Sequence, residues 1–358
     1  MILAARQVRH RELPVRVLVV DDSVVIRRML TKFIESDGTM KVVDSARDGQ
    51  QALEKIQSLA PDAITLDVEM PVMDGLGVLA RLRTLRAELR PAVLMCSTLT
   101  AAGSTHALEA MRLGAADVIA KDASDEEPRA REFLPTPRAP GEAPNKNFPP
   151  RPPSPANLPK REYQLVVVGS STGGPPVVER LISGLPRTLS TPLVLAQHMP
   201  AMFTRGLADR LAQISAVAVH HADQDMPLER GHVYIIQGGK HGRVHATPAG
   251  RLRLEISDEP KTALYKPCVN ELFASAAQAT GDATIGVVLT GMGDDGLIGG
   301  RELAASRGVI LAQEGSTCVV YGMPKAVVDA GIATPGTPDS IVAALVSAVG
   351  GKVAAKVA

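Results

Sequence analysis

The strongest constraint on the fold is a proline-rich stretch that interrupts the chain. Eleven prolines lie within residues 123–160 of the 358-residue sequence, and apolar residues show no periodicity there. Such a stretch cannot bury enough apolar surface to offset the entropy lost on ordering it. We therefore predict a linker over residues 126–160, which separates a domain at residues 15–125 from a larger domain at residues 161–353.

Both predicted domains alternate short β-branched runs with amphipathic stretches, the pattern of parallel sheets covered by helices. The first domain contains predicted strands near residues 15–20, 41–45, 63–66, 92–96 and 117–120. The second domain contains predicted strands near residues 164–168, 192–196, 232–236, 286–290 and 309–312. The predicted fold class is α/β, with two doubly wound parallel-sheet domains: a (βα)5 domain and a larger α/β domain.

Composition argues against several classes of function. The formal net charge of +1 gives no general attraction for nucleic acid or acidic membranes, and the absence of Trp disfavours base stacking. No apolar run reaches the ~20 residues of a membrane span, and the N-terminus lacks an apolar signal core. The three cysteines are far apart and predict neither a disulfide framework nor a cysteine metal site. We expect a cytoplasmic protein that does not bind nucleic acid or insert into membranes.

Polar residues follow the predicted strands of the first domain. Asp21 and Asp22 come after the first strand and Asp67 after the third, while Ser97 and Lys121 follow the fourth and fifth. The carboxyl ends of parallel strands meet at one edge, where converging carboxylates require a cation and oxygen ligands suit Mg²⁺. An aspartate there can accept a phosphoryl group, and a hydroxyl and an ammonium group can contact its oxygens. The alternatives are that Asp21, Asp22 and Ser23 cap the helix that starts at Val24, that Asp67 is a solvated strand end, and that Lys121 is a surface lysine.

Three strings make this domain similar to the receiver domain of bacterial two-component response regulators. They are VVDDS at residues 19–23, LDVEMPVMDG at residues 66–75 and MCST at residues 95–98. The resemblance implies that a partner histidine kinase phosphorylates Asp67, with Ser97 and Lys121 as switch residues. It also implies Mg²⁺ bound by Asp21, Asp22, Asp67 and the backbone carbonyl of Glu69.

One junction departs from the receiver pattern. Receivers usually carry Lys-Pro with a cis peptide bond, whereas this chain has Lys121-Asp122. A cis bond before a residue other than proline costs about 3–4 kcal/mol, so we predict a trans bond here.

A glycine-rich turn follows the first predicted strand of the second domain. The string GSSTGG at residues 169–174 satisfies G-x-S-x-G and singles out Ser171 as a nucleophile. A serine needs a base and an orienting carboxylate, and His198 and the pair Asp294 and Asp295 follow two further strands. The order Ser, His, Asp differs from that of α/β-hydrolases. On spacing alone, a turn that binds phosphate or nucleotide remains an alternative.

Four strings of this domain resemble the catalytic domain of chemotaxis protein-glutamate methylesterases. They are VGSSTGG at residues 168–174, QHMP at 197–200, LTGMGDDG at 289–296 and GMP at 322–324. The resemblance implies Ser171 as nucleophile, His198 as base and Asp295 as orienting carboxylate, with backbone amides near Thr172 and Met292 stabilising the oxyanion. It implies hydrolysis of glutamate methyl esters on chemoreceptors without a cofactor, and deamidation of receptor glutamines as a second activity.

The family also carries an Arg-Pro-Ser-Val-Asp-type string, where this chain reads KPCVN at residues 266–270. The difference removes a hydroxyl and a carboxylate, which leaves the predicted triad intact and bears on the identity of the substrate receptor. Two other functions remain as alternatives: a DNA-binding response regulator, and an adaptor that keeps the fold without catalysis. Five histidines near predicted turns are expected to be surface residues rather than metal ligands, namely His220, His221, His232, His241 and His245.

Overall fold

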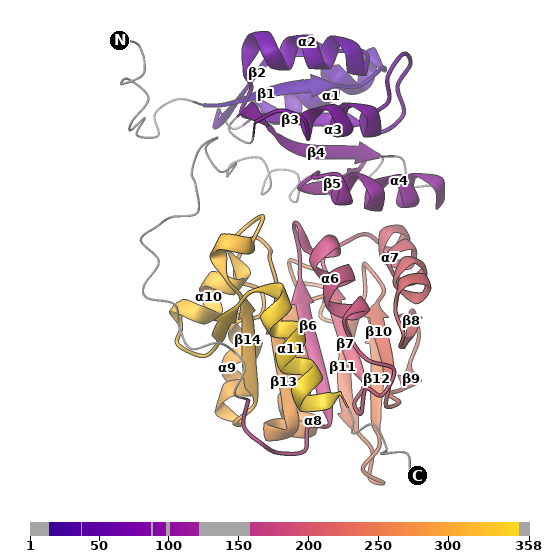
Figure 1. Cartoon of the computed structure of the whole chain (residues 1–358), viewed down its shortest axis with the longest axis vertical. Coiled ribbons are helices and arrows are strands. Elements are labelled where there is room, and N and C mark those ends of the chain that lie inside the picture. Colours follow the sequence, from indigo (N-terminus) through magenta and orange to yellow (C-terminus); the bar gives the residue numbers. More distant parts are fainter. Residues whose placement is uncertain (1–13, 37, 87–88, 98–100, 122–157, 351–358) are drawn as a thin grey trace, which may run out of the picture. The chain divides into compact units, whose positions relative to one another are not determined.

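The computed structural model describes residues 14–36, 38–86, 89–97, 101–121 and 158–350. The predicted linker lies outside these residues except for 158–160, and so do Asp122, Thr98 and residues 351–353. The described residues form two α/β units (Figure 1). Within the described part of the chain, no helix combines the length and the apolar character needed to span a membrane.

The first unit is a parallel five-stranded sheet with strand order β2-β1-β3-β4-β5. Its strands are β1 (Val15–Val20), β2 (Met40–Ala46), β3 (Ala63–Asp67), β4 (Ala92–Ser97) and β5 (Asp117–Ala120). Its helices are α1 (Val24–Ile34), α2 (Gly49–Leu59), α3 (Gly75–Leu82) and α4 (Ala101–Arg112). The chain runs outward from β1 in both directions, so the loops after β1 and β3 border the topological switch point.

Alternating apolar residues account for the packing of this unit. Val17 and Val19 point to one face of β1, where they form a core with Leu30 and Ile34 of α1. Five strands and four helices of the predicted (βα)5 arrangement are present, and the residues that follow β5 lie outside the described part of the chain from 122 to 157.

The second unit is a parallel seven-stranded sheet with strand order β15-β14-β13-β6-β7-β10-β8. Its strands are β6 (Leu165–Ser170), β7 (Leu193–Gln197), β8 (Ala218–Ala222), β10 (His232–Ile236), β13 (Thr284–Val288), β14 (Val309–Gln313) and β15 (Thr334–Gly336). A smaller antiparallel sheet comprises β9 (Met226–Pro227), β11 (His241–Ala246) and β12 (Leu252–Ser257).

Helices pack on both faces of the large sheet. They are α6 (Gly174–Ser183), α7 (Ala201–Ile214), α8 (Val269–Thr280), α9 (Leu297–Ala305), α10 (Met323–Asp329) and α11 (Pro338–Val349), with short 3-10 turns at Gly281–Ala283 and Gly315–Thr317. Leu165 and Val167 of β6 pack with Phe273 of α8 on one face, while Val166 and Val168 are buried on the other. Burial of consecutive residues is the expected pattern for a parallel sheet covered twice.

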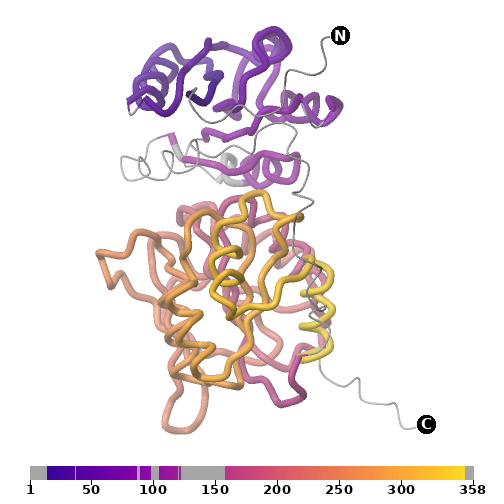
Figure 2. The backbone as a smooth tube through the Cα atoms, turned by 90° about the vertical axis from the view of Figure 1, so that its left-hand side faces the viewer, coloured from indigo at the N-terminus to yellow at the C-terminus, as the bar shows by residue number. Residues whose placement is uncertain are grey.

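The path of the chain brings distant segments together in this unit. After β6 the strands β7, β8 and β10 form one half of the sheet, and the chain then returns to place β13 on the other side of β6 (Figures 1 and 2). The loops after β6 and β13 therefore lead away in opposite directions and border the switch point, where ligands bind in such sheets.

The predicted α/β fold class is confirmed, and all of the predicted strands are present. The strand predicted at 286–290 occupies Thr284–Val288, because the chain turns away from the sheet earlier than its apolar run suggests. The prediction for the histidines is wrong in part: all five lie in strands, and His241 is fully buried, with Nε2 3.2 Å from the Pro260 carbonyl oxygen. Burial lowers the pKa of His241, which favours its neutral form.

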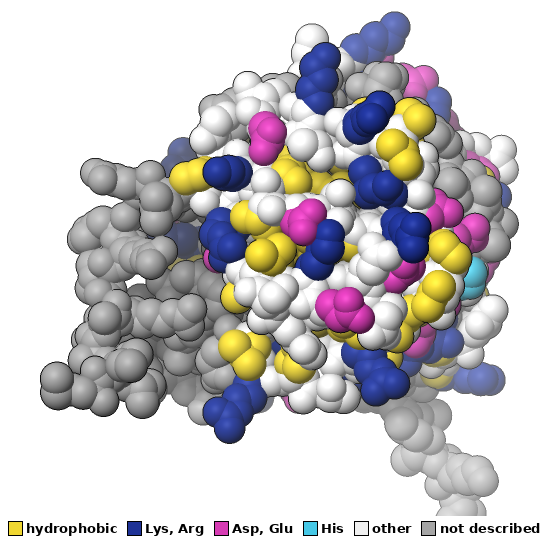
Figure 3. Space-filling model, turned by 90° about the horizontal axis from the view of Figure 1, so that it is seen from above, with side chains coloured by type: hydrophobic (Ala, Val, Ile, Leu, Met, Phe, Trp, Pro, Cys, Tyr) yellow, Lys and Arg dark blue, Asp and Glu magenta, His cyan; other side chains and the backbone are white. Residues whose placement is uncertain are grey.

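Charged and apolar side chains are interspersed on the face of the molecule seen in Figure 3. Lys and Arg side chains alternate there with Asp, Glu and apolar side chains instead of forming a continuous basic stripe.

Candidate functional site

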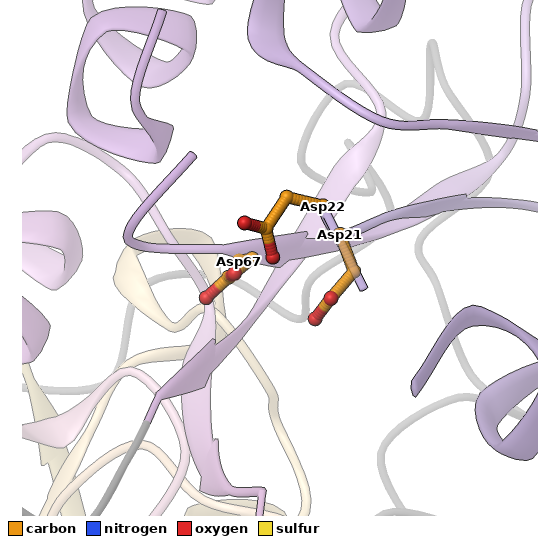
Figure 4. Close-up of side chains that lie close together, drawn as sticks. All are labelled: Asp21, Asp22 and Asp67. Carbon is orange, nitrogen blue, oxygen red and sulfur yellow. The ribbon is translucent and has the colours of Figure 1, made fainter. Parts of the chain in front are cut away.

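The three aspartates predicted in the first unit form a cluster at its switch point. Carboxylate oxygens of Asp21, Asp22 and Asp67 all lie within 4.8 Å of one another. Figure 4 shows the three side chains directed toward one another from the ends of β1 and β3. Asp21 and Asp67 are buried and Asp22 is exposed, so one side of the cluster faces solvent.

Helix capping does not account for the two aspartates after β1. The N-cap of α1 is Ser23, whose hydroxyl accepts a hydrogen bond from the Ile26 amide at 3.4 Å. Asp21 uses Oδ1 to accept the Ser23 amide at 2.9 Å, which holds its carboxylate in the turn. The turn leaves the Asp21 and Asp22 carboxylates together beside Asp67.

Lys121 belongs to this cluster rather than to the surface. Its Nζ lies 2.8 Å from Asp21 Oδ2 and 2.7 Å from Asp67 Oδ2, and most of its side chain is buried. Burial opposes the charged ammonium, but its hydrogen bonds to the Asp21 and Asp67 carboxylates outweigh this effect and raise the pKa of Lys121. The lysine therefore reaches the carboxylates with aspartate, not proline, as the following residue.

The positive charge of Lys121 does not fully offset the burial and negative charge around Asp67. Burial raises the pKa of Asp67 above its ordinary value, and the neighbouring charge of Asp21 adds to this, although Lys121 acts in the opposite direction. A divalent cation among the carboxylates would offset the same repulsion. An all-oxygen donor set with one open side fits Mg²⁺, which retains several waters.

The other two predicted residues of this site lie nearby. Ser97 ends β4 and is buried, and its carbonyl accepts the Lys121 amide at 2.9 Å. The Glu69 amide lies 3.4 Å from Asp67 Oδ1, which brings the backbone of Glu69 next to the phosphoacceptor candidate. The Glu69 carbonyl as a metal ligand stays a prediction.

In the second unit, sheet register brings the predicted nucleophile and base together. Ser170 pairs with Gln197 across β6 and β7, so Ser171 and His198 are the next residues on two adjacent strands. Neighbouring strands lie about 4.8 Å apart, so these two side chains leave the sheet side by side. Both residues are buried.

Several hydrogen bonds fix the backbone around Ser171. Its amide donates to the Thr290 carbonyl at 3.0 Å, which ties it to the loop after β13. Its carbonyl accepts the Gly174 amide at 2.8 Å and Gln197 Nε2 at 2.9 Å. Gly173 has a φ of 73°, a left-handed conformation that favours glycine and turns the chain into α6.

His198 is bonded to a buried carboxylate. Its Nε2 lies 2.9 Å from Asp295 Oδ2, and the ring stacks on Tyr265 with centroids 4.5 Å apart and an interplanar angle of 9°. Burial opposes ionisation of Asp295, but hydrogen bonds from His198 and from the Val269 and Asn270 amides outweigh it and lower its pKa. Asp295 is therefore an anion that can orient an imidazole and stabilise its cation.

The loop after β13 approaches the nucleophile closely. A Cβ on Gly291 would lie 2.7 Å from Ser171 Cβ, so only glycine fits there, and Met292 is the next residue. The Thr290 hydroxyl donates to the Thr172 carbonyl at 3.0 Å and accepts the Val320 amide at 3.0 Å. Thr290 thereby joins the two segments from which oxyanion donors are predicted.

The sequence did not reveal the residues whose contacts fix the backbone and side chains of this site. Gln197, Tyr265 and Thr290 were missed, and the KPCVN segment at residues 266–270 was noted without its contact to Asp295. Two of them stand inside the strings that carry the family resemblance, but their partners lie far away along the chain. Their roles become visible only when the sheet order is known.

Known proteins match both units. A family model described as CheB methylesterase matches residues 166–345, and one described as a response regulator receiver domain matches residues 17–131. A relative from Oleidesulfovibrio alaskensis, named protein-glutamate methylesterase/protein-glutamine glutaminase 1, is 43% identical over 353 residues. This alignment covers 89% of the present chain and 95% of the relative.

Two further matches agree with this one. A relative from Caulobacter vibrioides, named protein-glutamate methylesterase/protein-glutamine glutaminase 2, is 40% identical over 334 residues, covering 89% of this chain and 94% of the relative. The crystal structure of the CheB methylesterase catalytic domain of Thermotoga maritima matches with a TM-score of 0.50 and 35% identity. That match covers 52% of this chain and 99% of the solved one.

Replacing Asp67 tests the acidic cluster. Asp67→Asn removes the nucleophilic carboxylate and is expected to abolish Mg²⁺-dependent phosphoryl labelling by acetyl phosphate. The control is Asp44→Asn, an exposed aspartate on β2 that pairs with Lys55 outside the cluster. Labelling should be followed by intact-protein mass spectrometry, and undiminished labelling of Asp67→Asn would contradict the assignment.

Two adjacent aspartates provide a matched test of the carboxylate. Asp295→Asn is expected to slow labelling of Ser171 by a fluorophosphonate by more than roughly a hundredfold, because the amide does not stabilise the imidazolium. Asp294 is exposed, and Asp294→Asn is expected to stay within about threefold of the unmodified protein. Equal losses in the two variants would mean that the loop matters for its shape and not for the charge of Asp295.

Proposed function

This chain belongs to the CheB methylesterase family, and we propose that it is a phosphorylation-regulated protein-glutamate methylesterase acting on chemoreceptors in chemotaxis. The observation that supports the proposal is the parallel pairing of β6 with β7, because Ser171 and His198 directly follow these two neighbouring strands. His198 is in turn bonded to the buried carboxylate of Asp295. The relatives' names add glutamine deamidation, which we propose as a second activity. The proposed substrates are the cytoplasmic helices of the receptors.

The first half-reaction forms an acyl-enzyme. Ser171 Oγ attacks the side-chain carbonyl carbon of the methylated glutamate and gives its proton to His198. Because Nε2 is engaged by Asp295, Nδ1 is the ring nitrogen that acts as base in this orientation. Backbone amides near Thr172 and Met292 stabilise the oxyanion, and its collapse breaks the ester C–O bond as the imidazolium protonates the departing methanol.

The second half-reaction regenerates the serine. A water molecule gives a proton to His198 and attacks the acyl carbon, and Ser171 leaves with the proton that His198 returns. The product is a glutamate carboxylate. A glutamine side chain would pass through the same acyl-enzyme with ammonia as the leaving group, so one site can serve both reactions. His198 accepts and returns the proton in each half-reaction, so the proposed hydrolysis uses no cofactor.

Asp295 supports both half-reactions without a change in its own protonation. Its negative charge lies 2.9 Å from the ring nitrogen and stabilises the imidazolium that forms in each step. Tyr265 stacks parallel to the imidazole and restricts its rotation. These two contacts restrict the imidazole of His198 to one orientation.

The receiver domain supplies the control. We propose that Asp67 accepts a phosphoryl group from a chemotaxis histidine kinase, with Mg²⁺ held by Asp21, Asp22, Asp67 and the Glu69 carbonyl. When bound, the cation would neutralise charge on the transferring phosphoryl group. Lys121 and Ser97 then contact the new phosphoryl oxygens. The proposed receiver covers residues 15–125, the linker 126–160 and the esterase 161–353.

Methanol release tests the catalytic proposal. Ser171→Ala is expected to lose activity on methylated receptors of the same cell by several orders of magnitude, since triad members act as a unit. Ser170→Ala is the matched control, because the Ser170 hydroxyl is buried under α6 and is expected to tolerate removal with less than about threefold loss. Loss in the control alone would place the nucleophile one residue earlier.

A fragment that begins near Arg161 tests the proposed regulation by the receiver domain. An isolated catalytic domain has been solved for the Thermotoga maritima protein, which supports independent folding of this part. We expect the unphosphorylated receiver to inhibit the esterase. Phosphorylation would then shift the equilibrium between an inhibited and an active form, for which a few kcal/mol of differential stability between the two forms is enough. The fragment should release methanol faster than the unphosphorylated full chain and should not respond to acetyl phosphate. A slower fragment would show that the receiver activates the esterase.

A further inference from the structure

The carboxylate of Asp295 has four hydrogen-bond donors around it. Oδ2 accepts His198 Nε2 at 2.9 Å and the Val269 amide at 2.7 Å. Oδ1 accepts the Asn270 amide at 2.9 Å and the Cys268 thiol at 3.3 Å. Two of the four donors are the first amides of the 12-residue helix α8 and a third is the side chain of its N-cap, so the anion sits at a helix N-terminus.

Cys268 has an unusual place in this arrangement. It is the N-cap of α8, a position where Ser, Thr, Asp or Asn normally accepts amides of its own helix. A thiol is a weak acceptor, and here it is directed to Asp295 as a donor. Amides of the first turn are bonded by Asp295 instead, so the carboxylate that orients His198 also acts as the cap of α8.

Asn270 joins this helix to the loop that carries the carboxylate. Its side-chain Oδ1 accepts the amides of Gly296 at 3.0 Å and Gly299 at 2.9 Å, at the start of α9. A Cβ on Gly299 would lie 2.3 Å from the Asn270 carbonyl oxygen, so the two helix starts are in close contact. The neutral amide makes these bonds without placing a second negative charge near Asp295.

We propose that Cys268 and Asn270 are positioning residues of the hydrolytic site, which hold Asp295 as an oriented anion toward His198. Cys268 supplies a donor to the oxygen of Asp295 that does not face the histidine. Asn270 fixes the loop after β13 through a neutral acceptor. The inference rests on the proposed roles of Ser171, His198 and Asp295. It gives a function to the two positions at which KPCVN departs from the family's string.

The charges around Asp295 agree with this assignment. Burial and the negative charge of Asp295 raise the pKa of the Cys268 thiol to about 12, so the thiol keeps its proton and remains a donor. Among the described residues, the titratable groups bonded to this carboxylate are His198, which follows β7, and Cys268, the N-cap of α8, while Tyr265 stacks on the imidazole. Lys266 bonds the Asp258 carbonyl instead, and Asp294 on the same loop is exposed. A carboxylate at position 270 would add the repulsion that the amide avoids.

The test uses the full-length protein and the rate of Ser171 labelling by a fluorophosphonate, measured between about pH 5 and pH 9. Cys268→Ala is expected to slow labelling roughly three- to tenfold, because Asp295 loses a donor. Cys268→Ser restores a donor of similar size and is expected to remain within about twofold. Thermal unfolding of each variant reports whether the fold is retained.

Asn270→Asp provides a readout that a purely structural role would not change. A second negative charge near Asp295 and His198 should stabilise the imidazolium, so the acid limb of the pH–rate profile should move to higher pH. Gln278→Glu adds the same charge to an exposed position of α8 and should leave the profile in place.

The outcomes separate this inference from the proposed function. Labelling that persists in Ser171→Ala would overturn the nucleophile and the proposed function with it. Labelling that requires Ser171, together with unmodified rates in Cys268→Ala and an unmoved acid limb in Asn270→Asp, would overturn only the positioning roles. If Cys268→Ala fails to fold, the comparison of Asn270→Asp with Gln278→Glu decides the inference on its own.

Discussion

The parallel pairing of strands is the constraint on which both candidate sites depend. In each unit the chemistry-bearing side chains follow strands, and parallel order brings their carboxyl ends to one edge. The register of β6 with β7 makes Ser171 and His198 neighbours, although the two residues belong to separate βα units. The bond from the Ser171 amide to the Thr290 carbonyl then fixes this pair to the loop after β13. Because β13 pairs with β6, the loop after β13 can bring the Asp295 carboxylate within hydrogen-bond distance of His198.

The Asp67 cluster and the Asp295 site differ in the groups that balance their buried negative charge. The cluster around Asp67 gathers three carboxylates against one ammonium group, and burial raises the pKa of Asp67. That cluster remains short of positive charge, which suits a site that takes up a cation and then a phosphoryl group. Asp295 is instead a single carboxylate bonded by backbone amides and an imidazole, and its pKa is lowered. A carboxylate that stays ionised suits the orienting role that we propose for Asp295.

Much of this could be predicted from the sequence because strand ends carry local signals. Asp67, Ser171 and His198 each follow an apolar β-branched run, and short strings around them are distinctive. Elements with weaker signals were missed: β8 and β11 contain histidines and lie at an edge or in the small sheet. Contacts across the sheet could not be predicted, because they depend on strand order. No local pattern indicates that the Thr290 hydroxyl bonds the Thr172 carbonyl, or that the start of α8 lies behind Asp295.

The KPCVN segment shows how a departure from a family pattern acquires a physical meaning. In the sequence, the loss of a hydroxyl and a carboxylate bore on the identity of the substrate receptor and left the predicted triad intact. The structure places Cys268 and Asn270 on the side of Asp295 that faces away from the imidazole. A change of substituent there acts on the charge and orientation of the carboxylate before it acts on any substrate. Two of the four donors to Asp295 are backbone amides, which any residue except proline supplies, whereas the donor from Cys268 depends on its side chain.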